Sequence, residues 1–158
     1  MNFDVVNQTF TAAQNQNSFT SIDLALDGNN DLVVLPNGYL GIVTGSLKLQ
    51  QDCRIFLQSP KGSCIIDSGW GNAALNLLGQ APMSPATLRA AVHGALTTLK
   101  YYKDQEETSR GYPLENSELI SSIQDVSVTP APDNVTWNVV VTVFDKDNAG
   151  VSFAVSLT

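Results

Sequence analysis

The chain has 158 residues, with eight basic against fifteen acidic side chains and a formal net charge of −7. This length is enough for one ordinary domain plus an arm. Nucleic acid and anionic membranes would repel such a surface, because binding to either depends on positive charge. No apolar run approaches the ~20 residues that span a bilayer, and the first ten residues do not resemble a signal peptide. We therefore expect a cytosolic product that binds neither nucleic acid nor membrane.

Few residues could support metal or redox chemistry. Cys53 and Cys64 are the only cysteines. They are either a disulfide or redox pair, or two small apolar side chains in a reducing compartment, and we favour the second interpretation. His93 is the only histidine and the sequence has no CxxC pair, so a four-ligand zinc site lacks ligands. We expect no metal and no cofactor.

Residues 1–20 form a polar arm, rich in Asn, Gln, Thr and Ser and interrupted by Phe3, Phe10 and Phe19. So little apolar surface cannot hold a fold by itself. The arm is either a frayed terminus or a segment whose phenylalanines dock on a neighbouring subunit. The predicted organisation is this arm followed by one domain over residues 21–158.

Short strands are predicted over residues 21–26 and 31–35, separated by the turn DGNN. A helix is predicted from about residue 44 to residue 58, where Pro60-Lys61-Gly62 ends it. Its apolar stripe is predicted to comprise Val43, Leu47, Cys53 or Gln50, and Leu57, widened by Leu49 and Phe56.

A brief strand over residues 63–67 and a short helix over residues 72–78, closed by Gly79, are predicted next. The strongest helix signal follows, because Ser84 can cap and Pro85 occupies the first helical position. Gly94 inside this helix indicates close packing against another helix. The predicted core face is Leu88, Val92, Ala95, Leu99 and Tyr102. The charged far end is interpreted as solvated: Lys100, Lys103, Asp104, Glu106, Glu107 and Arg110.

A short helix is predicted to begin at Asn116 or Ser117 and to include Ile123. After it, the spacing of the apolar residues changes from a helical period to a period of two. Apolar residues, mostly valines, alternate with mainly polar residues over 126–129, 135–143 and 151–157, with turn-rich links at 130–134 and 145–150. This pattern predicts a three-stranded antiparallel meander. The expected fold class is α+β, with an arm and short strands, two main helices plus short helices, and a C-terminal three-stranded antiparallel sheet.

Three segments carry a resemblance to a known family: NGYLGIVTGSLKLQQDCRIFLQSPKG, DSGWGNAALNLLG and ELISSIQDVSV. Their order is similar to that of the small gene-25-type baseplate wedge proteins of contractile phage tails, often labelled lysozyme-like. Ser59-Pro60-Lys61-Gly62 resembles the family's Thr-x-x-Gly turn, and Trp70-Gly71 its Tyr-Gly or Phe-Gly. The family's Glu-Pro-Arg triplet is absent at Ile123-Gln124-Asp125-Val126, so its anchoring contact cannot be carried over.

The resemblance implies a structural subunit of a phage or phage-tail-like baseplate, assembled in the host cytoplasm and located in the virion tail. It implies no catalytic activity. Its expected partners are other baseplate wedge proteins, with tail sheath, tube or hub proteins as further candidates. The interface candidates are Phe3, Phe10, Phe19, Leu47, Gln50, Gln51, Arg54, Phe56, Gln124 and Asp125.

The lysozyme-like label also raises an enzymatic alternative. Glycoside hydrolysis needs two carboxylates flanking the scissile bond, and the candidates are Glu106, Glu107, Glu115 and Glu118. Glu106 and Glu107 are adjacent on a helix end and point about 100° apart. His93 could act as a base, but a packing histidine is the simpler interpretation. Trp70 and Trp137 could form a sugar-stacking platform of a carbohydrate-binding module, whereas we interpret Trp70 as a packing plug and Trp137 as core or interface.

Overall fold

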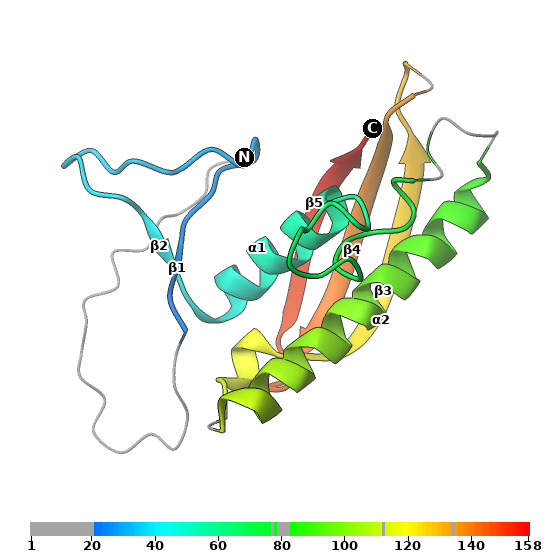
Figure 1. The fold of residues 1–158 in the computed structure, drawn as a ribbon. Helices are drawn as coiled ribbons and strands as arrows, with labels where there is room; N and C mark the ends of the chain where they lie inside the picture. The colour runs from blue at the N-terminus through cyan, green and yellow to red at the C-terminus, as the bar shows by residue number, and fades with distance from the viewer. Residues whose placement is uncertain (1–20, 77, 79–82, 112, 134) are drawn as a thin grey trace.

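The computed structural model describes residues 21–76, 78, 83–111, 113–133 and 135–158. The predicted arm over residues 1–20, with its three phenylalanines, lies outside the described residues, and so does Gly79. Figure 1 shows that residues 21–43, here called the ribbon, project from a body made of helices and a sheet.

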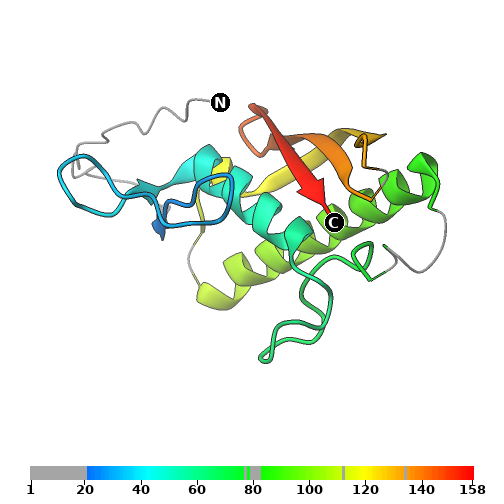
Figure 2. The same ribbon diagram turned by 90° about the horizontal axis from the view of Figure 1, so that it is seen from above.

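The body has two layers. The sheet has the order β3-β4-β5 and consists of β3 (Ile120–Pro130), β4 (Trp137–Asp145) and β5 (Gly150–Leu157), all antiparallel. Helices α1 (Gly45–Gln58) and α2 (Pro85–Arg110) cover one face of this sheet, which Figure 2 shows from above. The predicted α+β class and the antiparallel meander are confirmed.

Period-two alternation explains how the sheet forms the core. Successive residues of a strand point to opposite faces, and β5 alternates strictly between exposed and buried side chains. The buried face of β4 presents three valines with no exposed surface to the helices. These are Val139, Val141 and Val143. The opposite face carries mainly Ser, Thr and Asn side chains, together with Val140 and Phe144 of β4, and is largely exposed.

Helix α2 begins as predicted, because the N–H of Thr87 donates to Ser84 Oγ (3.1 Å) and Pro85 follows the cap. Its predicted face is buried from Leu88 to Leu99, with Tyr102 half-buried. The helix ends at Gly111, which adopts φ 72°. The prediction for Gly94 is wrong. Gly94 is exposed, and a Cβ there would meet no atom within 4 Å.

Helix α1 spans nearly the predicted residues, but its buried stripe is shifted from the predicted one. Leu49, Cys53, Phe56 and Leu57 have no exposed surface. Leu47, which the prediction placed on the stripe, is 43% exposed. The pattern was ambiguous because apolar residues surround most of this helix, and packing against both β5 and α2 selects the buried side.

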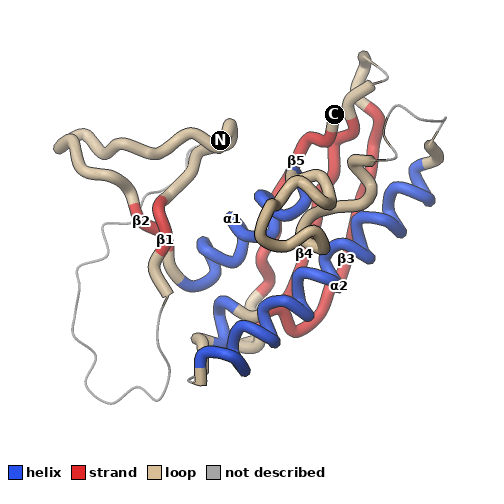
Figure 3. Tube along the Cα trace, in the orientation of Figure 1, coloured by secondary structure: helices blue, strands red, loops and turns tan. Residues whose placement is uncertain are grey.

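The long loop between α1 and α2, drawn in tan in Figure 3, corrects two predictions. Residues 63–67 form no strand, Asn72 makes an isolated bridge with Pro60, and residues 73–76 form turns rather than a helix. Ile65 and Ile66 are almost completely exposed, so this apolar run has no core to join. The helix predicted near Asn116 is a single 3-10 turn, η1 (Asn116–Glu118), and Ile123 belongs to β3.

Candidate interaction site

The ribbon, residues 21–43, is built from three short extended segments that pair in a cycle. The N–H of Ala25 donates to Gly41, that of Gly41 to Val33, and that of Val33 to Ala25, at 2.8 to 2.9 Å. Strands β1 (Asp23–Leu24) and β2 (Ile42–Val43) form the antiparallel base of the ribbon next to α1. The predicted strand over 21–26 contains β1, residues 31–35 make only isolated bridges, and β2 was not predicted.

Local chemistry explains the turns between these segments. Asp27 Oδ1 accepts from the N–H groups of Asn29 (2.8 Å) and Asp31 (3.0 Å), which fixes the first turn. Gly38 adopts φ 81° in the second turn, a conformation that favours glycine. At the centre of the cycle a Cβ on Gly41 would lie 3.1 Å from the Cβ of Ala25. The three segments therefore meet closely around a residue without a side chain.

The small centre leaves the larger apolar side chains of the ribbon outside. Val34 is 62% exposed and Tyr39 is 71% exposed. The other exposed apolar residues of the ribbon are Ile22, Leu24, Leu32, Leu40 and Ile42. Single exposed apolar residues are ordinary in soluble proteins, but a concentration of seven on one projecting element is typical of a binding surface.

Polar side chains of α1 attach the ribbon to the body. Gln51 Nε2 donates to the carbonyl of Leu24, and Gln51 Oε1 accepts from the N–H of Leu26, both at 2.8 Å. Arg54 donates to the carbonyl of Leu26 (3.1 Å), and burial lowers the pKa of its guanidinium. These side chains thus satisfy backbone groups of the ribbon that a neighbouring strand would otherwise pair with.

The carboxylate of Glu118 provides the attachment at the start of the ribbon. This side chain has no exposed surface, and its two oxygens accept from the N–H (3.0 Å) and the hydroxyl (2.6 Å) of Ser21. Burying a carboxylate is costly unless it is hydrogen-bonded. We conclude that Glu118 has a structural role in holding Ser21, where sequence reasoning had considered it as a catalytic acid.

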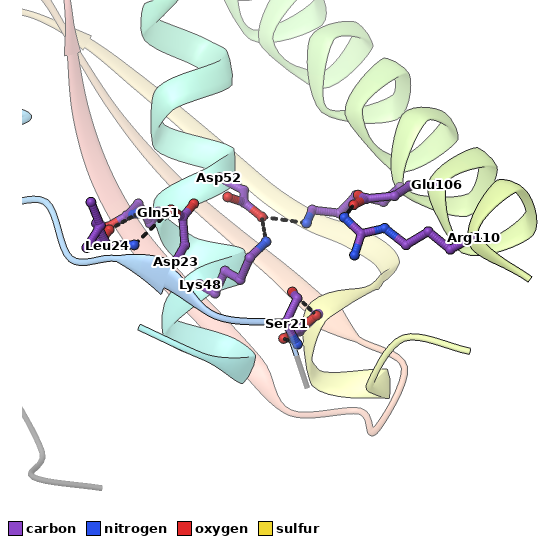
Figure 4. A network of polar contacts seen from close by, with 10 residues as sticks. Ser21, Asp23, Leu24, Lys48, Gln51, Asp52, Glu106 and Arg110 are labelled. Carbon is purple, nitrogen blue, oxygen red and sulfur yellow. Dashed lines mark hydrogen bonds and ion pairs between the residues drawn. The ribbon is translucent and has the colours of Figure 1, made fainter. Parts of the chain in front are cut away.

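An ion triad joins α1 to α2 beside the ribbon, as Figure 4 shows. Asp52 Oδ2 lies 2.9 Å from Lys48 Nζ and 2.5 Å from Lys103 Nζ. Burial alone would lower the pKa of Lys48, but the attraction and hydrogen bond of Asp52 raise it. The side chain of Lys103 is only 5% exposed, which corrects the interpretation of this helix end as fully solvated.

A groove of about 370 Å³ opens next to this triad. Trp70 and Tyr102 form its aromatic part, with ring centroids 5.4 Å apart. Burial and a hydrogen bond to Asp67 raise the pKa of the Tyr102 phenol. The groove is a candidate small-ligand site, although its central carboxylate is already paired with two ammonium groups. It is lined by Lys48, Asp52, Asp67, Trp70, Leu99, Tyr102, Lys103 and Glu106.

The structure separates the predicted interface residues into two groups. Phe56 is completely buried and packs against Trp70, with ring centroids 4.8 Å apart, so it stabilises this chain's own fold. Gln51 and Arg54 are buried beneath the ribbon. These three therefore lie inside the chain and offer no exposed contact surface. Leu47, Gln124 and Asp125 are exposed, and Gln50 donates to the carbonyl of Ser152 on β5 (3.1 Å).

The structure does not gather the candidate catalytic residues into one site. Glu106 pairs with Arg110, and Glu107 lies 3.2 Å from Lys146 of the β4–β5 turn. Glu115 lies outside the helices, in the segment before η1. His93 is exposed on α2, so its interpretation as a packing residue is wrong. Trp70 is confirmed as a packing residue at the loop, and Trp137 packs against the core.

The remaining predictions concern thiols, metals and membranes. Cys53 and Cys64 are both free thiols, and burial raises the pKa of Cys53 to about 12. Among the described residues, no group of three His, Cys, Asp or Glu side chains could hold a metal ion. None of the helices described is both long and apolar enough to cross a bilayer.

No protein-family model matches the chain, and no curated protein matches it.

Proposed function

We propose that this chain is a structural subunit of a contractile-tail baseplate wedge, in a phage or a related injection particle, and that it joins neighbouring wedge proteins. The observation that carries the proposal is the ribbon, which exposes seven apolar side chains on an element that projects from the body. The resemblance of the helix–loop segments to gene-25-type wedge proteins specifies which kind of assembly. The proposed location is the tail baseplate, after assembly in the host cytoplasm.

The attachment of the ribbon supports a role in docking. Two buried side chains of α1, Gln51 and Arg54, together with Glu118, fix its backbone to the body. A surface whose position is fixed before binding loses less conformational entropy when a partner arrives. The apolar residues are thus presented on a preorganised element, as an assembly contact requires.

Incorporation into particles tests this proposal. Val34→Asp places a charge on the ribbon, and Val135→Asp is the matched control, since Val135 is 68% exposed and lies before β4. Both variants should keep the wild-type melting temperature. Only Val34→Asp should reduce the amount of chain in purified tail particles, by more than about tenfold, because burying a valine contributes about 1.5–3 kcal/mol.

Quantitative mass spectrometry of purified particles measures this difference. Absence of the wild-type chain from the particles contradicts the proposal. Equal incorporation of the two variants would show that the ribbon is not the docking element.

A second candidate function rests on the groove. An aromatic wall of Trp70 and Tyr102 next to Asp67 and Glu106 could stack and bind a sugar, as in a carbohydrate-binding or lysozyme-like tail protein. We prefer the structural role because Lys48 and Lys103 already pair with Asp52 there. Quenching of tryptophan fluorescence by chitooligosaccharides, abolished in Asp67→Asn, would favour the sugar-binding alternative. Cleavage of peptidoglycan by the purified chain, lost in Glu106→Gln, would favour the enzymatic one.

A further inference from the structure

We propose that the ribbon docks into an apolar groove edged by Lys or Arg side chains on a different polypeptide, and not onto a second copy of this chain. The inference rests on the proposed role of the ribbon in docking and specifies the chemistry of its partner. It comes from the combination of exposed apolar residues with charges of one sign on the same element.

All charged side chains of the ribbon are acidic. Asp23 and Asp31 are exposed, Asp27 is half-buried, and no Lys or Arg occurs before Lys48 in the described chain. Asp23 and Asp31 directly precede the exposed Leu24 and Leu32, so each exposed acidic side chain lies one residue from an exposed apolar one. Charges at the margin of an interface select the partner by complementarity. The fitting surface is apolar at its centre and basic at its edge.

In the described part of a second copy, the Lys and Arg side chains do not form such a basic rim. All eight Lys and Arg side chains lie in the described part of the chain. Six of them are engaged within the chain by carboxylates or by the ribbon's own backbone. The remaining two, Lys61 and Arg89, are exposed but lie on different elements, the loop after α1 and the first turns of α2. The engaged residues are Lys48, Arg54, Lys100, Lys103, Arg110 and Lys146.

The net charge of the chain also argues against a second copy as the partner. Two chains that each carry −7 repel one another, and contact between two ribbons would bring acidic side chains together. A different polypeptide with basic residues around its groove avoids both the repulsion between the chains and the contact between acidic side chains. Electrostatic attraction would also increase its association rate with the ribbon at low ionic strength.

Site-specific photo-crosslinking in the cells that produce the particle tests this inference. The full chain carries p-benzoylphenylalanine in place of Tyr39, the most exposed large apolar side chain of the ribbon, or in place of Val135 as control. Mass spectrometry then identifies the crosslinked peptide. The expected peptide comes from a different protein and contains apolar residues flanked by Lys or Arg. A crosslink to a second copy, a peptide without basic residues, or no crosslink above the Val135 control overturns the inference.

Neutralisation of the ribbon tests the charged rim separately. The double variant Asp23→Asn, Asp31→Asn should lower the crosslink yield by about 2- to 10-fold, the effect of losing two exposed charge pairs. Asp133→Asn, in the β3–β4 turn, is the control and should leave the yield unchanged. An unchanged crosslink yield in the double variant would overturn the inference that the partner's groove is edged by basic side chains.

The outcomes also distinguish this inference from the proposed function. A basic, apolar partner that belongs to no tail particle would retain the inference and overturn the wedge role. A tail protein that contacts the ribbon without basic residues would support the wedge role and overturn this inference.

Discussion

The amide side chain of Gln51 in α1 takes the place of a neighbouring strand beside Leu24. Its Nε2 donates to the carbonyl of Leu24, and its Oε1 accepts from the N–H of Leu26. Both bonds are 2.8 Å long, and Gln51 is only 5% exposed. A primary amide can do this because it carries a donor and an acceptor side by side. Gln51 therefore holds two backbone groups of the ribbon at once, beside the attachments made by Arg54 and Glu118.

We predict that Gln51→Ala loosens the ribbon without unfolding the body. The variant leaves a carbonyl and an N–H of the ribbon without their partners, which costs about 1–3 kcal/mol. Hydrogen exchange should become faster at Leu26, while amides of β4 keep their protection. Gln105→Ala, at an exposed position on α2, is the matched control and should change neither. Unchanged exchange at Leu26 in Gln51→Ala would show that the amide does not hold the ribbon.

The sequence predicted those elements whose signals are local. Ser84 and Pro85 mark the start of α2, and alternating valines mark β4 and β5, so each element could be recognised from its own residues. The run at 63–67 has the composition of a strand, but no neighbouring strand is available to pair with it. A strand is defined by its partner, and a short sequence pattern does not contain that information.

The candidate site was predicted less well than the fold, because its contacts join distant residues. Lys103 is buried since Asp52, 51 positions earlier, pairs with it. Gln51 was predicted to lie at an interface with another protein, but the sequence did not indicate that its partner is the chain's own ribbon. The cyclic pairing of Ala25, Val33 and Gly41 has no local signature either. The sequence did offer one signal for the site. Residues 21–43 contain many apolar residues but are too few to bury them in a core of their own.

We predict that Gly71→Ala disturbs the loop between α1 and α2. Gly71 has φ 108°, and a Cβ there would lie 2.6 Å from the carbonyl oxygen of Pro60, which is backbone and cannot move aside easily. The free energy of unfolding, measured by urea titration, should fall by more than about 1 kcal/mol. Gly94→Ala is the control. It introduces the same methyl group into open space on a helix and should raise stability by up to about 1 kcal/mol.

We predict that Asp52→Ala is strongly destabilising. It removes the shared partner of Lys48 and Lys103, and the buried Lys103 ammonium keeps no carboxylate at the observed 2.5 Å contact. Removing one partner of a buried ion pair costs about 3–5 kcal/mol. Asp104→Ala is the control, because Asp104 pairs with Lys100 at a more exposed position and should cost less than about 1 kcal/mol. Similar urea midpoints for the two variants would contradict the structural importance of the triad.

Our last prediction concerns stability in alkali. Burial raises the pKa of Cys53 from its usual value of 9.0 to about 12, with Lys103 opposing and Asp52 assisting. Below pH 9 the thiol is protonated in both the folded and unfolded states and has no effect. Between pH 9 and about 12 only the unfolded chain loses this proton, so the free energy of unfolding falls by up to about 1.4 kcal/mol per pH unit. Cys53→Ala should lower stability at pH 7 by leaving a small cavity, yet show a shallower decline above pH 9, because the other titrating groups remain. Parallel pH profiles for the two proteins, measured by urea denaturation, would show that Cys53 is not kept neutral by the fold.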